Sequence, residues 1–471
     1  MAINRRRFIL GMSGAGLALC TRRVFKLGGM LGAGTALGTQ LDNLGVAFDA
    51  SLTVDKIPRI INIFLYGGPS ELAGNLSNIV EINANSQNPY GNIFDPNNAS
   101  TVVTPNYFWS TAGGTVLEQL VASGDATVYR TMNRIKDQNR AHGICVQQNL
   151  VGNLDVYHPG TATTLAWILQ NNNPYRNPDG SVRDLSKVVF PFVTFEGESK
   201  AFNRADIDIP PALKPIALNA NLMNPYQRTD HTVAGLNNSG ATDTALEQLA
   251  RLTNGGGAYK LTTESLIQRA EAATNITAML NNIPVPSSSF NYGTGNFGTR
   301  LSAAVSLILA NPDTLYVSLG SSGLGGWDDH SEMLGRYPAR MSEMMNAISA
   351  AVNHLNTAAA QGVAHADKVI VNVFGEFGRN VNLNESLGWD HGNNQNLYTF
   401  GGRGLASKGR VLGKIVGETQ RIGDKGVNRQ FTSPTANSYQ FEPFAVASTL
   451  FKYFGVTNPE LLSGEPPIAG A

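Results

Sequence analysis

The chain of 471 residues has few cysteines, few histidines and no net charge. It contains two cysteines and seven histidines, and its 35 basic residues balance 35 acidic ones. Because Cys20 lies in a basic N-terminal leader, Cys145 has no partner in the mature chain, and an intrachain disulfide is excluded there. Residues 48–471 carry 29 basic and 34 acidic side chains, a balance of −5. This balance gives no excess of basic residues of the kind that binds nucleic acid, so we expect no nucleic-acid partner.

Long hydrophobic runs are also missing. The longest apolar stretch of the leader, residues 28–37, is too short and too rich in glycine to cross a bilayer, so we expect no stable membrane span. A hydrophobic content of 42% with 15% charged residues is typical of a globular protein. The chain is long enough to bury a full core in one large domain.

The leader contains two arginine motifs, each followed by a weakly apolar stretch. Arg5-Arg6-Arg7 and Arg22-Arg23 both look like twin-arginine export signals, and Gly45-Val46-Ala47 is a candidate cleavage site. Because the motif occurs twice in tandem, translation can start at Met1 or at Met12. A mature chain without a disulfide fits a protein that folds before it leaves the cytoplasm. We therefore expect residues 1–47 to be a twin-arginine signal peptide, the translocase to be a partner, and the folded protein to reach the periplasm or cell surface.

Strand-like and helix-like patterns alternate along the remaining chain. The helical pattern places apolar residues on one face of residues 301–309 and of residues 341–355. Alternation of this kind predicts an α/β fold, with a mostly parallel central sheet flanked by helices on both faces. We expect one domain over residues 48–471, with surface insertions near residues 84–112 and 196–240. Strands are predicted at residues 59–66, 126–131, 188–195, 314–319, 369–374 and 397–400.

Three glycine-flanked runs collect acids and histidines in the last third of the chain. They are Gly325–His330, Gly375–Arg379 and Gly388–Gly392, and the first two follow predicted buried strands. Ligands of open α/β sheets bind just past such strand ends. Carboxylates and neutral imidazoles are ligands for Zn²⁺, Mn²⁺ or Fe, so we expect one or two divalent ions there. The candidate ligands are Asp328, Asp329, His330, Glu376, Asp390 and His391.

A structural interpretation of the same runs stays open. Aspartate and histidine beside glycine often cap helices or close turns, and Glu376 with Arg379 can be an ordinary ion pair.

The motifs, taken in order, resemble a family of twin-arginine-exported bacterial proteins of unknown function within the alkaline phosphatase and sulfatase superfamily. The resemblance covers about residues 58–466, and it implies an alkaline-phosphatase-like fold in which two metal ions at strand ends activate a nucleophile against phosphate or sulfate esters. The markers in this sequence are Gly67-Gly68-Pro69-Ser70, His142 within 141–148, Gly-Gly-Trp-Asp-Asp-His at 325–330, Glu376-Phe377-Gly378-Arg379, Asp390-His391-Gly392, Lys414 within 410–417 and the predicted helix 444–454.

The resemblance also implies roles for these residues. Asp328 or Asp329 with His330 would bind one ion, and the remaining three candidate ligands would complete the cluster. In such a hydrolase His142 would handle a proton or bind the substrate. Arg379 would clamp an anionic oxygen of the substrate, which is an anionic small-molecule or polymer ester.

The sequence departs from the family pattern at two places. Relatives usually carry acids where this chain has Ala73, Gly74 and Asn75, and an acid where Gln148 stands. Either Glu71 replaces the missing acids, or one of two metal positions is weakened. The nucleophile is unassigned, and Ser70 is better explained as a helix cap. Two functions therefore stay open: an exported metal-dependent hydrolase, and a catalytically reduced relative that acts as a binding module.

Overall fold

The computed structural model describes most of the chain from Leu41 onward. The leader expected at residues 1–47 lies largely outside the described residues, as do residues 84–103 of the first expected insertion and 223–240 of the second. The described residues are 41, 44–74, 104–172, 176–197, 199–203, 207, 209–220, 222, 278, 285–333, 335–381, 384–422 and 431–471.

An eight-stranded sheet forms the centre of the fold, in the order β10-β2-β9-β6-β1-β5-β3-β4. Strand β9 is antiparallel to both of its neighbours, whereas the other pairs are parallel. The central strands β1 and β6 are buried along their whole length, as the continuous apolar runs predicted. The strands are β1 Arg59–Leu65, β2 Ala126–Asn133, β3 Phe192–Thr194, β4 Ile216–Ala217, β5 Tyr316–Gly320, β6 Val369–Gly375, β9 Asn394–Gly401 and β10 Ile415–Val416.

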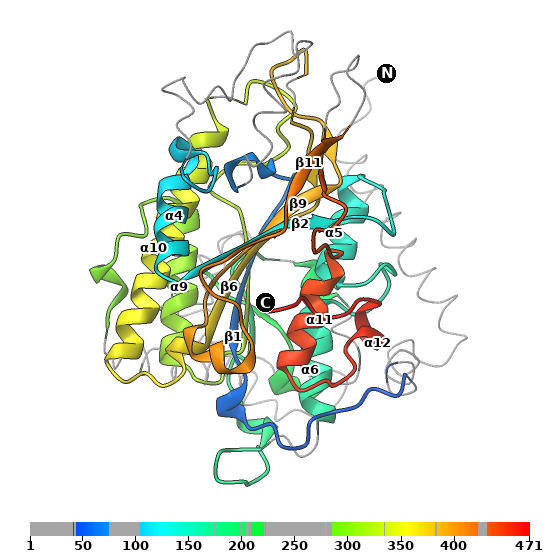
Figure 1. Ribbon diagram of the computed structural model, residues 1–471. Helices are drawn as coiled ribbons and strands as arrows, with labels where there is room; N and C mark the ends of the chain where they lie inside the picture. The colour runs from blue at the N-terminus through cyan, green and yellow to red at the C-terminus, as the bar shows by residue number, and fades with distance from the viewer. Residues whose placement is uncertain are drawn as a thin grey trace, which may run out of the picture.

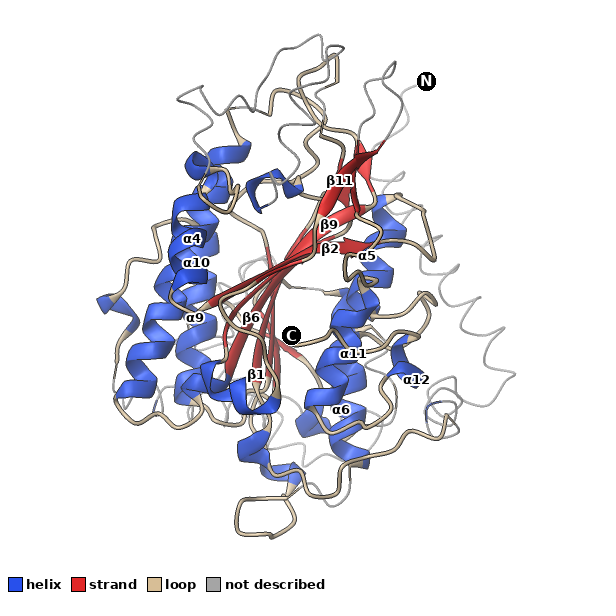
Figure 2. Cartoon of the chain, in the orientation of Figure 1, coloured by secondary structure: helices blue, strands red, loops and turns tan. Residues whose placement is uncertain are grey.

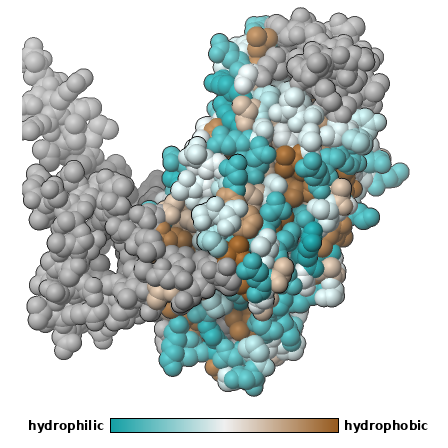
Figure 3. Space-filling view, turned by 90° about the vertical axis from the view of Figure 1, so that its left-hand side faces the viewer, coloured by the Kyte–Doolittle hydropathy of each residue, from teal (hydrophilic) through white to brown (hydrophobic). Residues whose placement is uncertain are grey.

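Helices cover both faces of this sheet (Figures 1 and 2). The outer surface on the side of α4, α9 and α10 is mostly hydrophilic, with smaller hydrophobic areas between (Figure 3). The prediction of a mostly parallel α/β sheet flanked by helices is confirmed. One layer holds α4 Gly114–Ala122, α9 Asn296–Ala310 and α10 Tyr337–Ala360, and the other holds α5 His142–Val151, α6 Thr161–Asn171, α11 Phe444–Tyr453 and α12 Glu460–Ser463.

Helix α10 shows why these segments are helical. Pro338 lies in its first turn, where a missing N–H costs nothing, and Gly362 with a positive φ of 92° follows its end. Met341, Met345 and Ile348 recur at helical spacing and are buried in the core between this layer and the sheet. The methionines of this helix are therefore part of the hydrophobic core. A second hydrophobic cluster fills the space between the sheet and the other helix layer.

Some elements differ from the sequence-based expectation. Strand β3 is shorter than residues 188–195, because Pro191 precedes it and offers no N–H to a ladder. Strand β4 was not predicted, and it extends the sheet from within the expected insertion 196–240. The smaller pairs are β7 Gly378–Arg379 with β8 His391–Gly392, and β11 Thr419–Ile422 with β12 Phe431–Pro434. The 3-10 helices are η1 Val54–Lys56, η2 Glu71–Gly74, η4 Ser110–Ala112, η5 Leu185–Lys187, η6 Lys200–Phe202, η7 Pro211–Leu213, η8 Ser287–Ser289, η9 Ala366–Lys368 and η10 Arg403–Lys408.

Two further observations concern the helices and the free cysteine. None of the helices in the described part of the chain combines the length and the apolar character needed to cross a membrane. Cys145 is a free, buried thiol whose pKa is raised to about 11 by burial.

Five chain segments meet at one edge of the sheet. The parallel strands β1, β2, β5 and β6 all end at this edge, and the antiparallel β9 begins there. The loops that carry the three glycine-flanked runs are consequently brought together by the direction of the strands.

Candidate metal centre

Four side chains converge at the carboxyl edge of the sheet: His142, Asp328, His330 and His391. One ligand atom of each lies within 4.8 Å of every other, which makes a group that can hold a metal ion. The Nε2 atoms of His330 and His391 are 3.0 Å apart. Asp328 Oδ1 lies 3.4 Å from His142 Nε2 and 3.2 Å from His330 Nε2. Donor atoms about 2.0–2.1 Å from one tetrahedral ion would lie roughly 3.3 Å from one another. The three distances above are close to this value, and the distance from His391 Nε2 to Asp328 Oδ1, 4.0 Å, is longer.

The four residues come from three loops that are far apart in the sequence. His142 is the first residue of α5, after β2. Asp328 and His330 lie in the loop that follows β5, and His391 lies in β8, just before β9. The β7–β8 ladder pairs His391 directly with Arg379.

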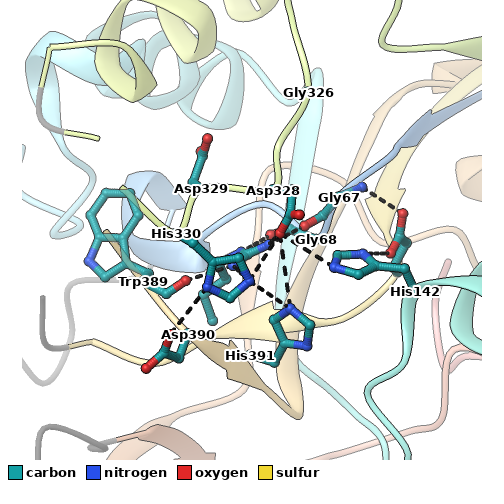
Figure 4. Close-up of polar contacts among 12 residues, drawn as sticks. Gly67, Gly68, His142, Gly326, Asp328, Asp329, His330, Trp389, Asp390 and His391 are labelled. Atoms are coloured by element: carbon teal, nitrogen blue, oxygen red, sulfur yellow. Dashed lines mark hydrogen bonds and ion pairs between the residues drawn. The ribbon is translucent and has the colours of Figure 1, made fainter. Parts of the chain in front are cut away.

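Each imidazole is oriented by a partner on its Nδ1 atom. His142 Nδ1 lies 2.6 Å from Glu376 Oε2, and His330 Nδ1 lies 3.2 Å from Asp390 Oδ1. His391 Nδ1 lies 2.8 Å from the carbonyl oxygen of Arg140. Because these partners are acceptors, the proton belongs on Nδ1, and the lone pair of Nε2 is left for another ligand. All three Nε2 atoms face Asp328 (Figure 4). Histidines that bind metals are held by a second shell of this kind.

Glycines allow these loops and the turn after β1 to approach one another closely. A side chain on Gly67, whose φ is 109°, would lie 2.4 Å from the backbone nitrogen of Asp328. A side chain on Gly388 would lie 2.0 Å from the carbonyl carbon of His330. The glycines of the motifs therefore have a steric role: they let one ligand loop lie against the next.

Tryptophans anchor the same loops in the core. Trp327 and Trp389 are fully buried, and each packs edge-on against the ring of Tyr337, with centroids 6.0 and 5.1 Å apart. The hydroxyl of Tyr337 in turn donates to the carbonyl oxygen of Ser70, 2.5 Å away. The exposed ligands thus stand on loops whose neighbouring residues are held rigidly.

Charges around the group favour the protonation states that bind metals. Burial works to raise the pKa of Asp328, but the hydrogen bond and the positive charge of Arg379 outweigh it and lower that pKa. Burial, with help from Arg379, lowers the pKa of His391 to about 4. At neutral pH Asp328 is therefore ionised and His391 is neutral.

Arg379 lies beneath the group and does not reach solvent. Its Nη2 donates to Asp328 Oδ1 at 2.8 Å and to the carbonyl oxygen of Gly67. Its Nε and Nη1 donate to the carbonyl oxygens of Gly68 and Trp389, each at 2.6 Å. The residue is 1% exposed. The sequence-based role of substrate clamp does not fit this geometry, because the guanidinium is occupied by three loops of its own chain.

The other sequence-predicted ligands surround the group without belonging to it. Glu376 is buried, and its second oxygen accepts from the backbone nitrogen of Gly67 at 2.6 Å, so it orients His142. Asp390 orients His330 in the same way. Asp329 turns away (Figure 4), and its carboxylate accepts from Arg340 Nη1 at 2.9 Å. His142, to which the sequence assigned proton transfer or substrate binding, lies within the four-residue group instead.

Glu71 and the residues at two positions where the resemblance implied acids, 73 and 148, are part of the supporting structure. Glu71 is buried, accepts from the backbone nitrogen of Arg379 at 3.0 Å and from Thr432 at 2.8 Å, and has its pKa raised to about 7 by burial. It lies outside the four-residue group, as does Gln148, whose amide donates to Asp137 at 2.8 Å. Ala73 is buried in the hydrophobic core. Ser70 Oγ accepts from the backbone nitrogen of Leu72 at 3.4 Å, which agrees with a capping role.

Two contributors to the site were missed by sequence reasoning. Arg140 binds His391 twice, through its carbonyl oxygen and through Nη1, which donates to the His391 carbonyl at 3.1 Å. Asn384 donates to Asp390 Oδ1 at 3.2 Å and to the carbonyl oxygen of His330 at 3.0 Å. The only signal in the sequence was position: Arg140 stands two residues before His142, and Asn384 stands between two of the motifs.

The group is open to solvent. The exposed fractions of the side chains are 37% for His142, 53% for Asp328, 44% for His330 and 24% for His391. Structural zinc sites are closed by their four protein ligands, whereas catalytic sites keep a position for water or substrate. The openness of this group is typical of the second kind.

Comparison with known proteins gives a family model and no characterised relative. Residues 222–448 match a model described as "Protein of unknown function (DUF1501)". The matched segment contains Asp328, His330 and His391, and it begins after His142. No curated protein matches the chain.

Proposed function

We propose that the protein is an exported metal-dependent hydrolase that acts on phosphate or sulfate esters. The single observation that carries this proposal is the convergence of three Nε2 atoms on one carboxylate, with every Nδ1 already held by an acceptor. A cluster that served only to close turns would not need three imidazoles aimed at one point. The solvent access of the cluster leaves room for an ester and for water.

The donor set suits a transition metal or zinc. Three imidazoles and one carboxylate are ligands of Zn²⁺, Mn²⁺ or Fe, and the described group has room for one such ion. A bound ion of this class supplies a Lewis acid that polarises an ester oxygen and lowers the pKa of a coordinated water.

The chain itself supplies position and charge. Glu376, Asp390 and the Arg140 carbonyl hold the three imidazoles in their ligand tautomer. Arg379 holds the carboxylate of Asp328 in its ionised form, and it also binds the loop after β1 and the loop before β8. Arg379 is therefore proposed as a positioning residue.

We extend the proposal to the superfamily and to export. The ordered markers and the mostly parallel sheet with ligands at its carboxyl edge support an alkaline-phosphatase-like fold. The paired arginines at residues 5–7 and 22–23 support a twin-arginine signal peptide over residues 1–47, the translocase as a partner, and a location in the periplasm or at the cell surface. Cell fractionation of an Arg22→Lys, Arg23→Lys variant tests this part, because loss of the signal would retain the protein in the cytoplasm.

Metal analysis of the purified mature chain, together with an ester assay, tests the hydrolase proposal. We expect one tightly bound ion per chain, hydrolysis of phosphate or sulfate esters, and loss of hydrolysis on chelation with recovery when the ion is returned. A protein that binds no divalent ion under any condition would contradict the proposal.

A second function is favoured by one observation. Two of the positions at which relatives carry acids are occupied by the buried Ala73 and by Gln148, and the part of the chain that the structure describes offers no second group for another ion. The chain would then use the same four-residue group to bind an anionic ligand without turnover. Tight metal binding with no hydrolysis of any ester in the panel would favour this binding module.

A further inference from the structure

One asparagine of helix α5 binds the main chain at the bend that ends β6. Asn149 Nδ2 donates to the carbonyl oxygen of Gly375 at 2.9 Å and to that of Glu376 at 2.8 Å. Successive carbonyl groups of a regular strand point in opposite directions, so a single amide group reaches both only where the chain bends. The bend at Glu376, directly after β6, meets this condition. Asn149 therefore fixes the backbone of the residue that orients His142.

Helix α5 contacts Glu376 at two levels. His142 and Asn149 are seven residues apart on this helix, which is about two turns, so they lie on the same side of it. His142 Nδ1 lies 2.6 Å from the carboxylate of Glu376, and Asn149 Nδ2 lies 2.8 Å from its carbonyl oxygen. Two bonds to one residue fix both the height and the rotation of the helix relative to the end of β6. The place of the His142 imidazole beside Asp328 thus depends on Asn149 as well as on Glu376.

The orientation of the Asn149 amide is fixed by a third partner. Arg134 Nη1 donates to Asn149 Oδ1 at 2.8 Å, and an arginine can only donate, so the amide nitrogen faces the two carbonyl oxygens. These three bonds use both hydrogens of the nitrogen and one lone pair of the oxygen. Asn149 is 3% exposed, so the loss of any of them leaves a buried polar group unsatisfied.

We infer that Asn149 is a positioning residue of the metal centre. It holds Glu376, and through Glu376 it holds the His142 imidazole in the Nδ1–H tautomer, with Nε2 toward Asp328. This inference rests on the metal centre of the proposed function, but the tautomer of His142 is measurable without a metal ion.

The first test uses the metal-free protein, with ¹⁵N in its seven histidines, at an alkaline pH where imidazoles are neutral. The signal that is lost in a His142→Ala protein assigns His142, and we expect its Nδ1–H tautomer to dominate in the wild type. Asn149→Asp keeps the shape of the side chain but places an oxygen against the two carbonyl oxygens. The bond from Glu376 that selects Nδ1–H is then disturbed, and the share of the Nε2–H tautomer should rise. Asn149→Ala, which only removes bonds, should act in the same direction.

The second test measures the affinity for Co²⁺, whose visible absorption reports on its ligands. Asn149→Asp should weaken binding by about tenfold, at the lower end of second-shell effects, and should shift the absorption toward that of the His142→Ala protein. In a His142→Ala background the same change should alter the affinity by less than about twofold, because the coupling through His142 is gone.

The matched control is Asn311→Asp. Asn311 is also buried, and its amide donates to the carbonyl oxygen of Val189 at 2.7 Å, but it precedes β5 at the opposite edge of the sheet. This variant should lose stability and keep the wild-type Co²⁺ affinity and the wild-type tautomer of His142.

The outcomes separate the role of Asn149 from the hydrolase proposal. If the Asn149 variants fold and neither changes the tautomer of His142, the inference is wrong, even if the wild-type protein hydrolyses esters. If Asn149→Asp weakens Co²⁺ binding equally with and without His142, Asn149 does not act through this histidine, and the inference is wrong as well. A wild-type protein that binds no Co²⁺ would count against the hydrolase proposal, while a tautomer change in the Asn149 variants would still support the role of Asn149 in orienting His142.

Discussion

Two layers of polar side chains lie at the carboxyl edge of the sheet, and they differ in exposure and in bonding. The outer layer is the four-residue group, whose side chains are 24–53% exposed. The inner layer is Glu71, Glu376 and Arg379, each at most 2% exposed. The outer side chains come from the start of α5 and from the Gly325–His330 and Gly388–Gly392 runs, whereas the inner ones come from the Gly375–Arg379 run and from Glu71 after β1.

The comparison shows which groups are able to bind a ligand. Every inner side chain already bonds to the backbone of another loop, and moving it toward an ion would leave buried donors and acceptors unsatisfied. The Nε2 atoms of the outer layer face one another and one carboxylate. The inner layer thus holds the loops in place, and the outer layer is able to coordinate.

Removing an outer imidazole should have the largest effect on metal binding. We expect His330→Ala or His391→Ala to lower metal affinity by more than the roughly 100-fold that second-shell changes produce, and to abolish ester hydrolysis. Stability of the metal-free protein should change by less than about 1 kcal/mol, because these side chains are partly exposed. Metal analysis, ester assays and denaturant unfolding measure the three effects.

The control for this experiment is a histidine outside the group. His365→Gln changes a residue whose Nε2 bonds to the carbonyl oxygen of Ile308 at 2.8 Å, and its metal content should stay at the wild-type level. Full metal content in the His330→Ala and His391→Ala proteins would refute the assignment of the outer layer.

Removing the inner cation should have the largest effect on stability. Arg379→Met leaves the carbonyl oxygens of Gly67, Gly68 and Trp389 without their donor and Asp328 without its counter-charge, which should cost about 3–5 kcal/mol of unfolding free energy. The exposed Arg336→Met, changed in the same way, should cost about 1 kcal/mol or less. Chemical denaturation compares the two variants. Equal losses of unfolding free energy would show that the buried bonds of Arg379 do not stabilise the fold as we describe.

The pH dependence of stability should reveal the buried acid of the inner layer. Burial raises the pKa of Glu71 to about 7 from an ordinary value of 4.5. A raised pKa means that the unfolded chain ionises first as pH rises, so the contribution of Glu71 is fully present below pH 4.5 and is lost between pH 4.5 and 7. The loss should be on the order of 3 kcal/mol.

A Glu71→Gln variant cannot ionise at this position and should lack that loss. The unfolding free energies of both proteins are measured across the same pH series. In the difference between the two proteins, the contributions of all other titrating groups cancel. Parallel curves for wild type and variant would contradict the assignment.

Neighbouring acids should differ in a smaller but measurable way. Glu376→Gln removes the charged partner of His142 and should weaken metal binding by about 10–100-fold. Asp329→Asn should change metal affinity by less than about twofold, because its carboxylate faces Arg340 and not the group. Competition with a metal-binding dye measures both, and a larger effect of Asp329→Asn than of Glu376→Gln would contradict the placement of Asp329 outside the metal-binding group.

Much of the sheet and helix framework, and the location of the site on it, were predictable from local sequence patterns. The apolar runs that became β1, β5 and β6 and the helical spacing of α9 and α10 are properties of short segments. The position of ligands past parallel strand ends follows from strand direction alone, so the proximity of His330 and His391 was predictable across 61 positions, whereas the place of Glu376 behind His142 was not.

The division of labour within each motif was decided by tertiary structure. Asp328 and Asp329 are adjacent and chemically identical, yet one faces three imidazoles and the other faces Arg340, because the loop direction points their side chains apart. The sequence motif predicted that Arg379 binds the substrate. In the structure its guanidinium instead bonds to three loops of the same chain. The sequence by itself determined the chemical types, their order and the sheet edge on which they lie. Burial and the partners contributed by distant loops decided which of them can coordinate, since a polar group that is already satisfied by its own chain has no bond left to offer.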